Sequence, residues 1–266
     1  AHVLRVFESD VVPHERGSVD PVRDMEDVDI ELALSDLAVV EKRLERLDKD
    51  RKKIKDPALD HEFEVLQRCR AALESNRPLR DLDLDEEAEK RIRGFQFLSL
   101  KPMLYVLNLG EDQAPRMAEI EAEFRARHLA HRKRTGVSAV CGKIEAELAE
   151  LSPEEAREYL ASFGLPGSAL ERVITDTYAL LGLMSFLTAG ETEVRAWTIP
   201  VNTRAIHAAG TIHTDFEKKF IRAEVVHWRD LVEAGGYAGA REKGILRLEG
   251  RDYIVRDGDV LLIRHG

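Results

Sequence analysis

The sequence of 266 residues predicts an α/β protein that carries a helical hairpin and ends in a second, α+β domain. Three observations predict this architecture. Apolar runs at residues 3–7, 103–107 and 136–141 have the length of buried strands and are separated by helical patterns. Residues 37–73 carry two heptad-spaced helical patterns joined by a short break. From residue 186 onward, short β-rich runs alternate with glycine turns.

The chain begins with the strand predicted at residues 3–7, and a polar loop follows it. Pro13, Gly17 and Pro21 punctuate this loop, which we expect to extend to Asp27. The first residue is Ala, and it stands where a strand is already in progress. We therefore expect the chain to be truncated or processed at its amino end.

Two helices that form an antiparallel coiled-coil hairpin are predicted next. Their apolar residues keep a and d spacing, Arg51 fills the one missing place, and charges crowd the other positions. Lys55-Asp-Pro57 separates the helices, and Asn76-Arg-Pro78 ends the second. The apolar positions are Leu37, Val40, Leu44, Leu47 and Ile54 in the first helix and Leu59, Phe63, Leu66 and Leu73 in the second. Cys69 lies beside this seam and is interpreted as a packing residue.

Helices and strands alternate after the hairpin. Asp85 can cap a short helix that leads to the strand at residues 103–107. An amphipathic helix follows this strand, and a basic loop is expected at residues 125–134. Ser152-Pro-Glu-Glu155 is a capping box with proline at the first helical position, which indicates a helix start. A further helix is expected at residues 168–183.

The carboxyl-terminal part reads as a separate compact domain of short strands. Asp257-Gly-Asp259 stands between the last two runs and predicts a hairpin turn. The β-rich runs are residues 194–199, 220–226, 245–248, 253–255 and 260–263.

Composition limits the classes of function. The net charge of −10 argues against a generic polyanion binder, so any nucleic-acid contact must come from a local basic patch. Two cysteines, Cys69 and Cys141, make neither a disulfide framework nor a metal set, which fits a reducing compartment. The sequence shows neither a membrane-length apolar run nor a secretory signal. We expect a cytoplasmic protein without a membrane partner.

The most informative segment is Lys101-Pro-Met-Leu-Tyr-Val-Leu-Asn-Leu-Gly-Glu111. Its apolar run ends in Asn108, and a carboxylate follows at Glu111. An amide and an acid at the carboxyl end of a buried strand can bind the edge of a purine base, because the amide donates and accepts while the carboxylate accepts. A strand-end turn is the alternative interpretation of Asn108 taken alone.

Several long motifs strongly resemble the YchF / Obg-like ATPase family, over nearly the whole chain. The motifs are Lys101-Pro-Met-Leu-Tyr-Val-Leu-Asn-Leu-Gly-Glu111, Lys143-Ile-Glu-Ala-Glu-Leu148, Leu183-Met-Ser-Phe-Leu-Thr-Ala-Gly-Glu-Thr-Glu-Val-Arg-Ala-Trp-Thr198, Ala209-Gly-Thr-Ile-His-Thr-Asp-Phe216, Gly235-Gly-Tyr-Ala-Gly-Ala-Arg-Glu-Lys-Gly244 and Asp257-Gly-Asp-Val260.

This resemblance implies a fold and an activity. The expected fold is a partial P-loop NTPase (G-domain-like) sheet, interrupted by an antiparallel coiled-coil hairpin and followed by an α+β β-grasp TGS domain. The implied activity is ribosome-associated binding and hydrolysis of ATP in preference to GTP, with Mg²⁺ in the complete family protein. The implied divisions are residues 1–36 and 94–161 for the nucleotide-binding part, 37–93 for the hairpin insertion, 162–181 for a linker helix and 182–266 for the TGS domain.

The resemblance also assigns base-binding residues. Asn108, Leu109 and Glu111 match the family's base-recognition motif, for which GTP-specific relatives have Asn-Lys-x-Asp. A glutamate is one methylene longer than the aspartate that pairs with guanine's N1–H and amine, and Leu109 would supply an apolar wall in place of the lysine. Cys141-Gly142-Lys143 aligns with the second base-contacting loop, usually Ser-Ala-Lys, so a hydroxyl contact is not expected here.

No residue of this sequence is a candidate catalyst for phosphoryl transfer. The segment 136–143 has five residues between its glycines instead of four, and Ile144 follows the lysine where a Ser or Thr would hold Mg²⁺. We expect the phosphate-binding loop and the Mg²⁺ ligands to lie ahead of the first residue, and the chain alone to be inactive as an ATPase.

Basic clusters are the candidate contacts with ribosomal RNA, although each is also explained as a solvated surface. No DNA contact is expected. His128 and His131 are interpreted as part of a basic face, in preference to a metal site. The clusters are Lys42, Arg43, Arg46, Lys49, Arg51, Lys52, Lys53 and Lys55 near the hairpin tip; Arg125, Arg127, Arg132, Lys133 and Arg134; and Lys218, Lys219, Arg222, His227 and Trp228, of which Trp228 is expected in the core.

Two other functions stay open at this point. The first is a nucleotide-independent adaptor whose hairpin and TGS domain bind ribosomal RNA or protein. The second, weaker alternative is a TGS module that serves a synthetase or an alarmone enzyme.

Overall fold

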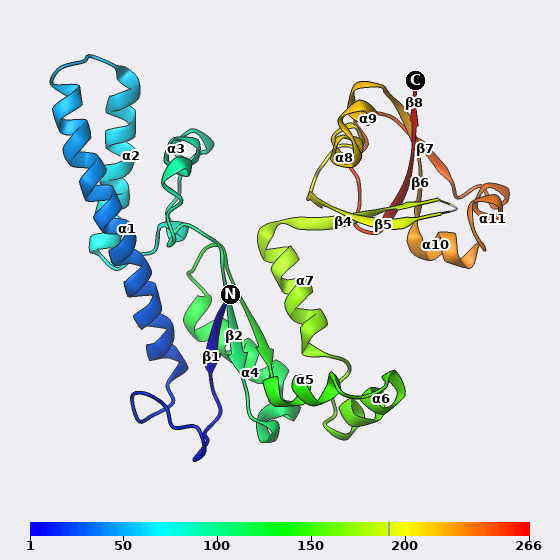
Figure 1. Ribbon diagram of the computed structural model, residues 1–266, viewed down its shortest axis with the longest axis horizontal. Helices are drawn as coiled ribbons and strands as arrows, with labels where there is room; N and C mark the ends of the chain where they lie inside the picture. Colours follow the sequence, from blue (N-terminus) through cyan, green and yellow to red (C-terminus); the bar gives the residue numbers. More distant parts are fainter. Residues whose placement is uncertain (191) are drawn as a thin grey trace. The chain divides into compact units, whose positions relative to one another are not determined.

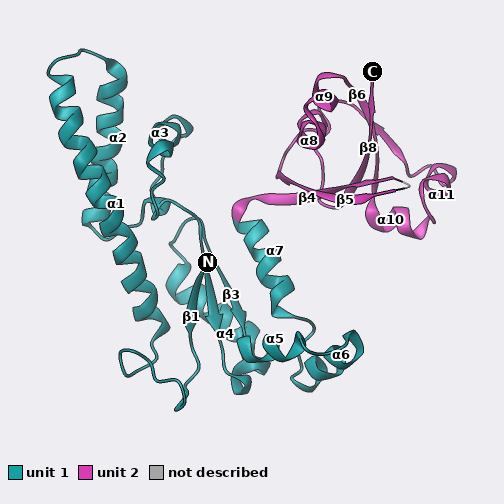
Figure 2. Ribbon diagram, in the orientation of Figure 1, with its two compact units in different colours: residues 1–180 teal, residues 181–266 magenta. Residues whose placement is uncertain are grey.

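The computed structural model describes residues 1–190 and 192–266 (Figure 1). They fold as two units, residues 1–180 and 181–266 (Figure 2). The α/β class expected from the sequence is confirmed, since both units combine helices with a sheet.

A parallel sheet organises the first unit. The described residues form three strands, β1 (His2–Arg5), β2 (Met103–Asn108) and β3 (Thr135–Val140), in the order β1-β2-β3. Both pairs are parallel, with Leu4 opposite Leu107 and Asn108 opposite Val140. The central strand β2 is almost entirely buried, as its continuous apolar run predicts for a parallel strand covered on both faces.

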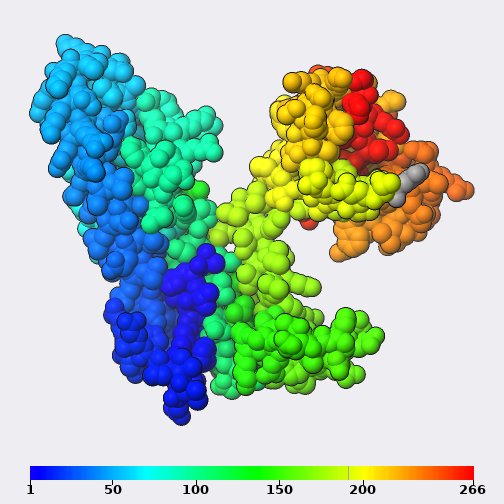
Figure 3. Space-filling view, viewed as in Figure 1, coloured from blue at the N-terminus to red at the C-terminus, as the bar shows by residue number. Residues whose placement is uncertain are grey.

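The hairpin consists of α1 (Pro21–Arg51) and α2 (Pro57–Glu74). The expected loop up to Asp27 is wrong, because helix α1 already begins at Pro21. The side chain of Asp20 accepts hydrogen bonds from the first backbone amides of α1, and proline at the first helical position has a suitable φ. Figure 3 shows the tip of the hairpin, in lighter blue and cyan, projecting at one end of this unit, while the first part of α1 lies along its side.

The seam between α1 and α2 follows the predicted spacing over most of its length. Ile54 is the exception: α1 ends at Arg51, and Ile54 is 59% exposed in the connection to α2. Arg51 contributes to the seam through its guanidinium, which lies 4.2 Å from the centre of the Phe63 ring and pairs with Asp60 at 2.5 Å. The fully buried seam residues include Val40, Leu44, Leu47, Val65, Leu66, Cys69 and Leu73, so the packing role of Cys69 is confirmed.

A buried ionic network joins the hairpin to the sheet. Asp29 of α1 is 6% exposed and pairs with Arg80, whose side chain is fully buried. Asp29 also accepts from the hydroxyl of Tyr105 in β2 and from Arg132, both at 2.9 Å. Burial, together with the charge of Asp29, raises the pKa of Tyr105 to about 12, so this hydroxyl stays a donor.

Short helices connect the strands of the first unit. The sequence-predicted caps are present: Asp85 accepts from Ala88, and Ser152 and Glu155 form the reciprocal capping box. The expected basic loop begins instead as a π-helical turn. The helices are η1 (Leu79–Asp81), α3 (Glu86–Ile92), η2 (Arg93–Phe95), η3 (Glu111–Arg116), α4 (Met117–Phe124), η4 (Arg125–Leu129), α5 (Gly142–Leu148), α6 (Pro153–Ser162) and α7 (Ala169–Leu181).

The second unit contains a mixed sheet whose described strands have the order β5-β4-β8-β6-β7. The strands are β4 (Leu183–Ala189), β5 (Val194–Pro200), β6 (Phe220–His227), β7 (Arg247–Glu249) and β8 (Asp259–His265). The helices are α8 (Ala205–Ile212), α9 (Thr214–Lys218), α10 (Trp228–Glu233) and α11 (Tyr237–Glu242). Strands β4 and β8 run parallel, and the other neighbours are antiparallel. Helix α8 packs three buried alanines against the core around Phe186 and Phe220.

The hairpin predicted at Asp257-Gly-Asp259 is wrong. Residues 253–255 form no strand, and Ile254 makes only an isolated bridge with Arg204. The buried carboxylate of Asp259 accepts from the hydroxyl of Tyr253 at 2.7 Å and from the amide of Arg256 at 2.9 Å. These bonds fold residues 253–259 back on themselves, and strand β8 then pairs with β6 and β4.

We predict that the variant Asp29→Ala loses about 3–5 kcal/mol of unfolding free energy, because Arg80 is then buried without a carboxylate. The measurement is urea denaturation followed by circular dichroism. Asp27→Ala is the matched control on the same helix, since Asp27 pairs with Arg16 at the surface at 2.8 Å, and it should cost less than about 1 kcal/mol. Equal losses in both variants would contradict a structural role of the network.

Candidate functional site

The candidate site lies at the carboxyl ends of the three parallel strands. Parallel strands end at the same edge of a sheet, so the residues that follow β1, β2 and β3 meet there (Figure 1). Asn108 is the last residue of β2, and Cys141 follows the last residue of β3. The edge encloses a cavity of about 530 Å³.

Asn108 is fixed by a hydrogen bond across this edge. Its Oδ1 accepts from the backbone N–H of Gly142, the first residue of α5, at 2.9 Å. Among the described residues, the Nδ2 amide of Asn108 has no further hydrogen-bond partner. Since Nδ2 carries two donor hydrogens, the side chain can donate to a ring nitrogen of a ligand in the cavity.

Glu111 and Lys143 form an ion pair beside Asn108. Glu111 begins η3, and Nζ of Lys143 bonds its Oε2. The hydrogen bond and the charge of Glu111 raise the pKa of Lys143. The other carboxylate oxygen, Oε1, forms no hydrogen bond with the described residues, and the Glu111 side chain is 35% exposed. A ligand that uses Glu111 therefore meets one free oxygen and one oxygen that Lys143 already occupies.

Leu109 and Cys141 are placed differently from the other four predicted site residues. Leu109 lines the cavity, but it is 2% exposed and belongs to the hydrophobic core below the edge. Its amide donates to the carbonyl of Val140 at 2.7 Å and continues the pairing of β2 with β3. Cys141 is 1% exposed in the same core. Both residues thus support the edge from beneath, while the predicted polar groups lie on it.

Sequence reasoning missed the contribution of the first strand to this cavity. Phe7, Glu8 and Ser9 follow β1 and line the cavity together with Gly110 and Asp112. The amide of Val6 donates to the carbonyl of Asn108 at 2.9 Å, which holds this segment against the end of β2. The strand predicted at residues 3–7 could have indicated this contribution, because parallel strands of one sheet end at the same edge.

Two further observations concern metal-binding side chains and membrane-length helices. In the described part of the chain, no group of three or more His, Cys, Asp and Glu side chains is arranged to hold a metal ion. The described helices also include none that is both long and apolar enough to cross a membrane.

Comparisons with known proteins agree along the whole chain. A profile of the family described as "YchF-GTPase_C, protein of unknown function (DUF933)" matches residues 183–266. The "Ribosome-binding ATPase YchF" of Bacillus subtilis is 44% identical over 263 residues, which cover 99% of this chain and 72% of that protein. The "Obg-like ATPase 1" of Oryza sativa subsp. japonica is 36% identical over 264 residues, 99% of this chain and 66% of that protein.

A solved structure has the same fold over this length. The Schizosaccharomyces pombe YchF GTPase superposes with a TM-score of 0.81 at 29% sequence identity. The superposition covers 98% of this chain and 71% of that one.

We predict that Gly142→Ala displaces the Asn108 side chain. A Cβ at position 142 would lie 3.1 Å from Oδ1 of Asn108, so the amide must retreat and the hydrogen bond weakens, at a cost of about 1 kcal/mol. The measurement is the shift of the Asn108 side-chain amide signals in ¹H–¹⁵N spectra. Gly94→Ala is the control, because a Cβ at Gly94 meets nothing within 4 Å. Unmoved Asn108 signals in Gly142→Ala would show that this contact is not formed in solution.

Proposed function

This chain belongs to the YchF / Obg-like ATPase family, and from this premise we propose that it is the base-binding and ribosome-contacting part of an ATP-preferring nucleotide hydrolase. The observation that carries the proposal is the polar edge of the sheet, where the anchored Asn108 and the pair Glu111–Lys143 surround a cavity of about 530 Å³. Pockets of this size hold small ligands such as a nucleotide base with its ribose.

The edge supports a preference for adenine over guanine. Guanine presents two parallel N–H donors, at N1 and the amine, and needs both oxygens of one carboxylate. Lys143, whose side chain is 65% exposed, competes with a ligand for Oε2 of Glu111, so a base that needs only Oε1 binds at a lower cost than one that needs both oxygens. The exocyclic amine of adenine can donate to that single oxygen, while the Asn108 amide donates to a ring nitrogen. A lost hydrogen bond of this kind changes affinity by about tenfold or more.

The residues present fit the base of ATP, and we assign none of them to its phosphates, to Mg²⁺ or to catalysis. Residues 136–140 of the imperfect glycine segment lie in β3, so they form a strand instead of a loop of backbone amides around phosphate. The chemistry of phosphoryl transfer rests on phosphate positioning and on Mg²⁺, and we propose no residue of this chain for either.

We propose ribosomal RNA as the partner of the hairpin tip, and a cytoplasmic location follows from that partner. Lys53 and Lys55 in the connection of the hairpin are exposed, and no ion-pair partner for them is found among the described residues. They are therefore available to phosphates. Arg51 is less available, since Asp60 and the Phe63 ring already hold its guanidinium.

The second basic cluster is a poorer candidate than its sequence suggests. Each of its cations pairs with an acid of the same unit, which reduces the charge that it offers to phosphates. The pairs are Arg125–Glu121, Arg127–Glu123, Arg132–Asp29, Lys133–Asp83 and Arg134–Glu89.

The second unit offers a further contact surface. Trp228, expected in the core, is 42% exposed at the start of α10, and Arg229 lies 5.3 Å from the centre of its ring. The expectation that Trp228 packs in the core is therefore wrong; Gly258 packs against one part of the indole, where an added Cβ would lie 2.8 Å away, and the rest of the side chain is exposed. His227 lies beside it, with ring centres 5.9 Å apart, so we propose His227, Trp228 and Arg229 as a contact with RNA. Lys218, Lys219 and Arg222 lie at the other end of β6 and would be a separate contact.

We further propose the family's domain division for this chain. Residues 1–36 and 94–161 form the nucleotide-binding part, 37–93 the coiled-coil insertion, 162–181 the linker helix and 182–266 a TGS domain of the β-grasp type. Helix α1 runs through the boundary at residue 36 without interruption, so the insertion shares its first helix with the nucleotide-binding part.

A nucleotide-independent adaptor is the second candidate, and the exposed hairpin lysines serve it equally well. The two functions differ in one respect: an NTPase couples nucleotide to ribosome binding, whereas an adaptor pellets with ribosomes equally with and without ATP.

We predict that Glu111→Asp and Lys143→Met each raise the affinity for guanosine relative to adenosine, by about tenfold. The first variant shortens the acid to fit the guanine fork, and the second frees both carboxylate oxygens. Nucleosides are suitable probes because they require only the base-binding edge, and the measurement is a titration of ¹H–¹⁵N shifts. Leu109→Lys is avoided, since it would place a charge in the core. Glu158→Gln, at an exposed position of α6 outside the cavity lining, is the control; an unchanged ratio in both test variants would refute base selection by Glu111.

We predict that Lys53→Glu with Lys55→Glu weakens ribosome co-sedimentation at low salt by about fivefold, with a smaller effect as salt rises. Both residues are exposed and unpaired, so the hairpin should remain folded. Arg157→Glu with Lys243→Glu is the control with the same change of charge at exposed positions elsewhere. If both double variants pellet like the unmodified chain, the hairpin tip is only a solvated surface.

A further inference from the structure

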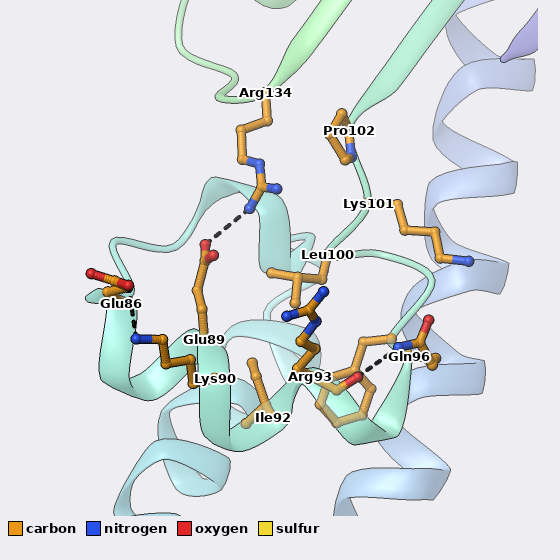
Figure 4. A pocket seen from close by; sticks show the side chains of 11 residues that line it. Glu86, Glu89, Lys90, Ile92, Arg93, Gln96, Leu100, Lys101, Pro102 and Arg134 are labelled. Carbon is orange, nitrogen blue, oxygen red and sulfur yellow. Dashed lines mark hydrogen bonds and ion pairs between the residues drawn. The ribbon is translucent and has the colours of Figure 1, made fainter. Parts of the chain in front are cut away.

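A second pocket lies in the first unit, at the opposite end of the sheet from Asn108. Helix α3 and the segment that leads into β2 form most of it, and Arg134, just before β3, closes one side (Figure 4). Its volume is about 390 Å³, within the range of small-ligand sites. Because parallel strands begin and end at opposite edges, this pocket is separate from the candidate base site.

The pocket carries an excess of positive charge. Its two acids are each engaged by one cation: Glu86 pairs with Lys90 at 2.8 Å and Glu89 with Arg134 at 3.0 Å. Two further cations, Arg93 and Lys101, also line the pocket, and neither has an ion-pair partner among the described residues. A local excess of two positive charges on a chain of net charge −10 selects for a small anion.

The arginines of the pocket differ in how they are held. Figure 4 shows Arg134 extending from the strand to Glu89, and Arg93 extending from the end of α3 toward Leu100. Lys101 lies at the rim with its side chain extended away from the others. The Arg134–Glu89 pair is partly exposed, so it is weak and Arg134 can exchange its partner.

The backbone on both sides of the pocket is held in an uncommon conformation. Gln96 and Arg134 have φ values of 55° and 50°, in the left-handed region that non-glycine residues rarely adopt. Hydrogen bonds maintain it: Nε2 of Gln96 donates to the carbonyl of Arg93 at 2.7 Å, and Met103 donates to the carbonyl of Arg134 at 3.0 Å. Such strained conformations are frequent at ligand sites, where a preformed backbone lowers the cost of binding.

We propose that this pocket binds a phosphate group, with Arg93 and Arg134 as its principal ligands and Lys101 completing the charge from the rim. Guanidinium groups match phosphate oxygens in pairs of hydrogen bonds, and two arginines on different elements can approach one phosphate from two sides. The inference goes beyond the proposed function, because it uses none of the residues around Asn108. The phosphate comes from a free nucleotide or from an RNA backbone, and the experiment separates these sources.

The test is calorimetric titration of the whole chain with uridine 5′-monophosphate at low salt. A pyrimidine is chosen because the edge at Asn108 is proposed to select purines. Arg93→Gln with Lys101→Gln, which breaks no ion pair, should lower the affinity by about tenfold or more. Arg157→Gln with Lys243→Gln removes the same charge elsewhere and should leave it within about twofold.

A third variant distinguishes binding from a structural role. Glu89→Gln removes the carboxylate that competes for Arg134 and should strengthen binding of the nucleotide by several-fold, a gain that loss of structure cannot produce. Competition by hexauridylate assigns the phosphate to RNA, whereas uridine monophosphate binding without competition assigns it to a free nucleotide. Absence of binding at millimolar concentration, or equal affinity in the first variant and its control, overturns the proposal.

Discussion

The buried carboxylate of Asp29 is the interaction on which the first unit depends. It belongs to the long helix α1, while its partners come from three other segments: Arg80 after the hairpin, Tyr105 in β2 and Arg132 before β3. A fully buried guanidinium is unfavourable unless a carboxylate neutralises it, and only the folded hairpin brings Asp29 to Arg80. The hairpin and the sheet therefore fold as one unit.

Strand β2 connects the hairpin to the candidate site. Strand β2 carries Tyr105, which anchors the hairpin, and three residues later Asn108, which faces the cavity. Side chains alternate along a strand, so these residues lie on opposite faces of β2. A second tie lies further along α1, where Asp36 accepts from the amides of Leu98 and Ser99 at 2.9 and 2.7 Å. The hairpin is thus fixed both to β2 and to the segment that enters it.

The sequence predicted features that depend on neighbours along the chain. The three strand segments of the first unit, the cap at Asp85 and the capping box at Ser152 belong to this class, and so does most of the hairpin seam. Pro21 was misjudged because proline serves equally as loop punctuation and as the first residue of a helix. The capping bonds from Asp20 decide between these roles, and they depend on a conformation that composition alone does not specify.

The sequence alone did not predict features that depend on partners far away along the chain. The basic residues 132–134 look like an exposed cationic surface in the sequence, yet their acids lie 103, 50 and 45 residues away. Similarly, the hairpin expected at Asp257-Gly-Asp259 does not form, and the buried Asp259 instead accepts hydrogen bonds from Tyr253 and Arg256. A short β-rich run cannot compete with a buried carboxylate that gains these hydrogen bonds.

Leu109 is buried in the core and is therefore not available as the apolar wall that the resemblance implied. From the sequence, Leu109 was an apolar wall over the base, but its side chain packs in the core beneath the strand end. The proposed selection of the base would then rest on the residues that remain at the edge, and among these Glu111 is the acid paired with Lys143. Whether a purine gains from Glu111 depends on how many of its donors the remaining oxygen can satisfy. In the proposed site adenine needs one acceptor and guanine needs two, so a lysine that competes for one oxygen would disfavour guanine more than adenine.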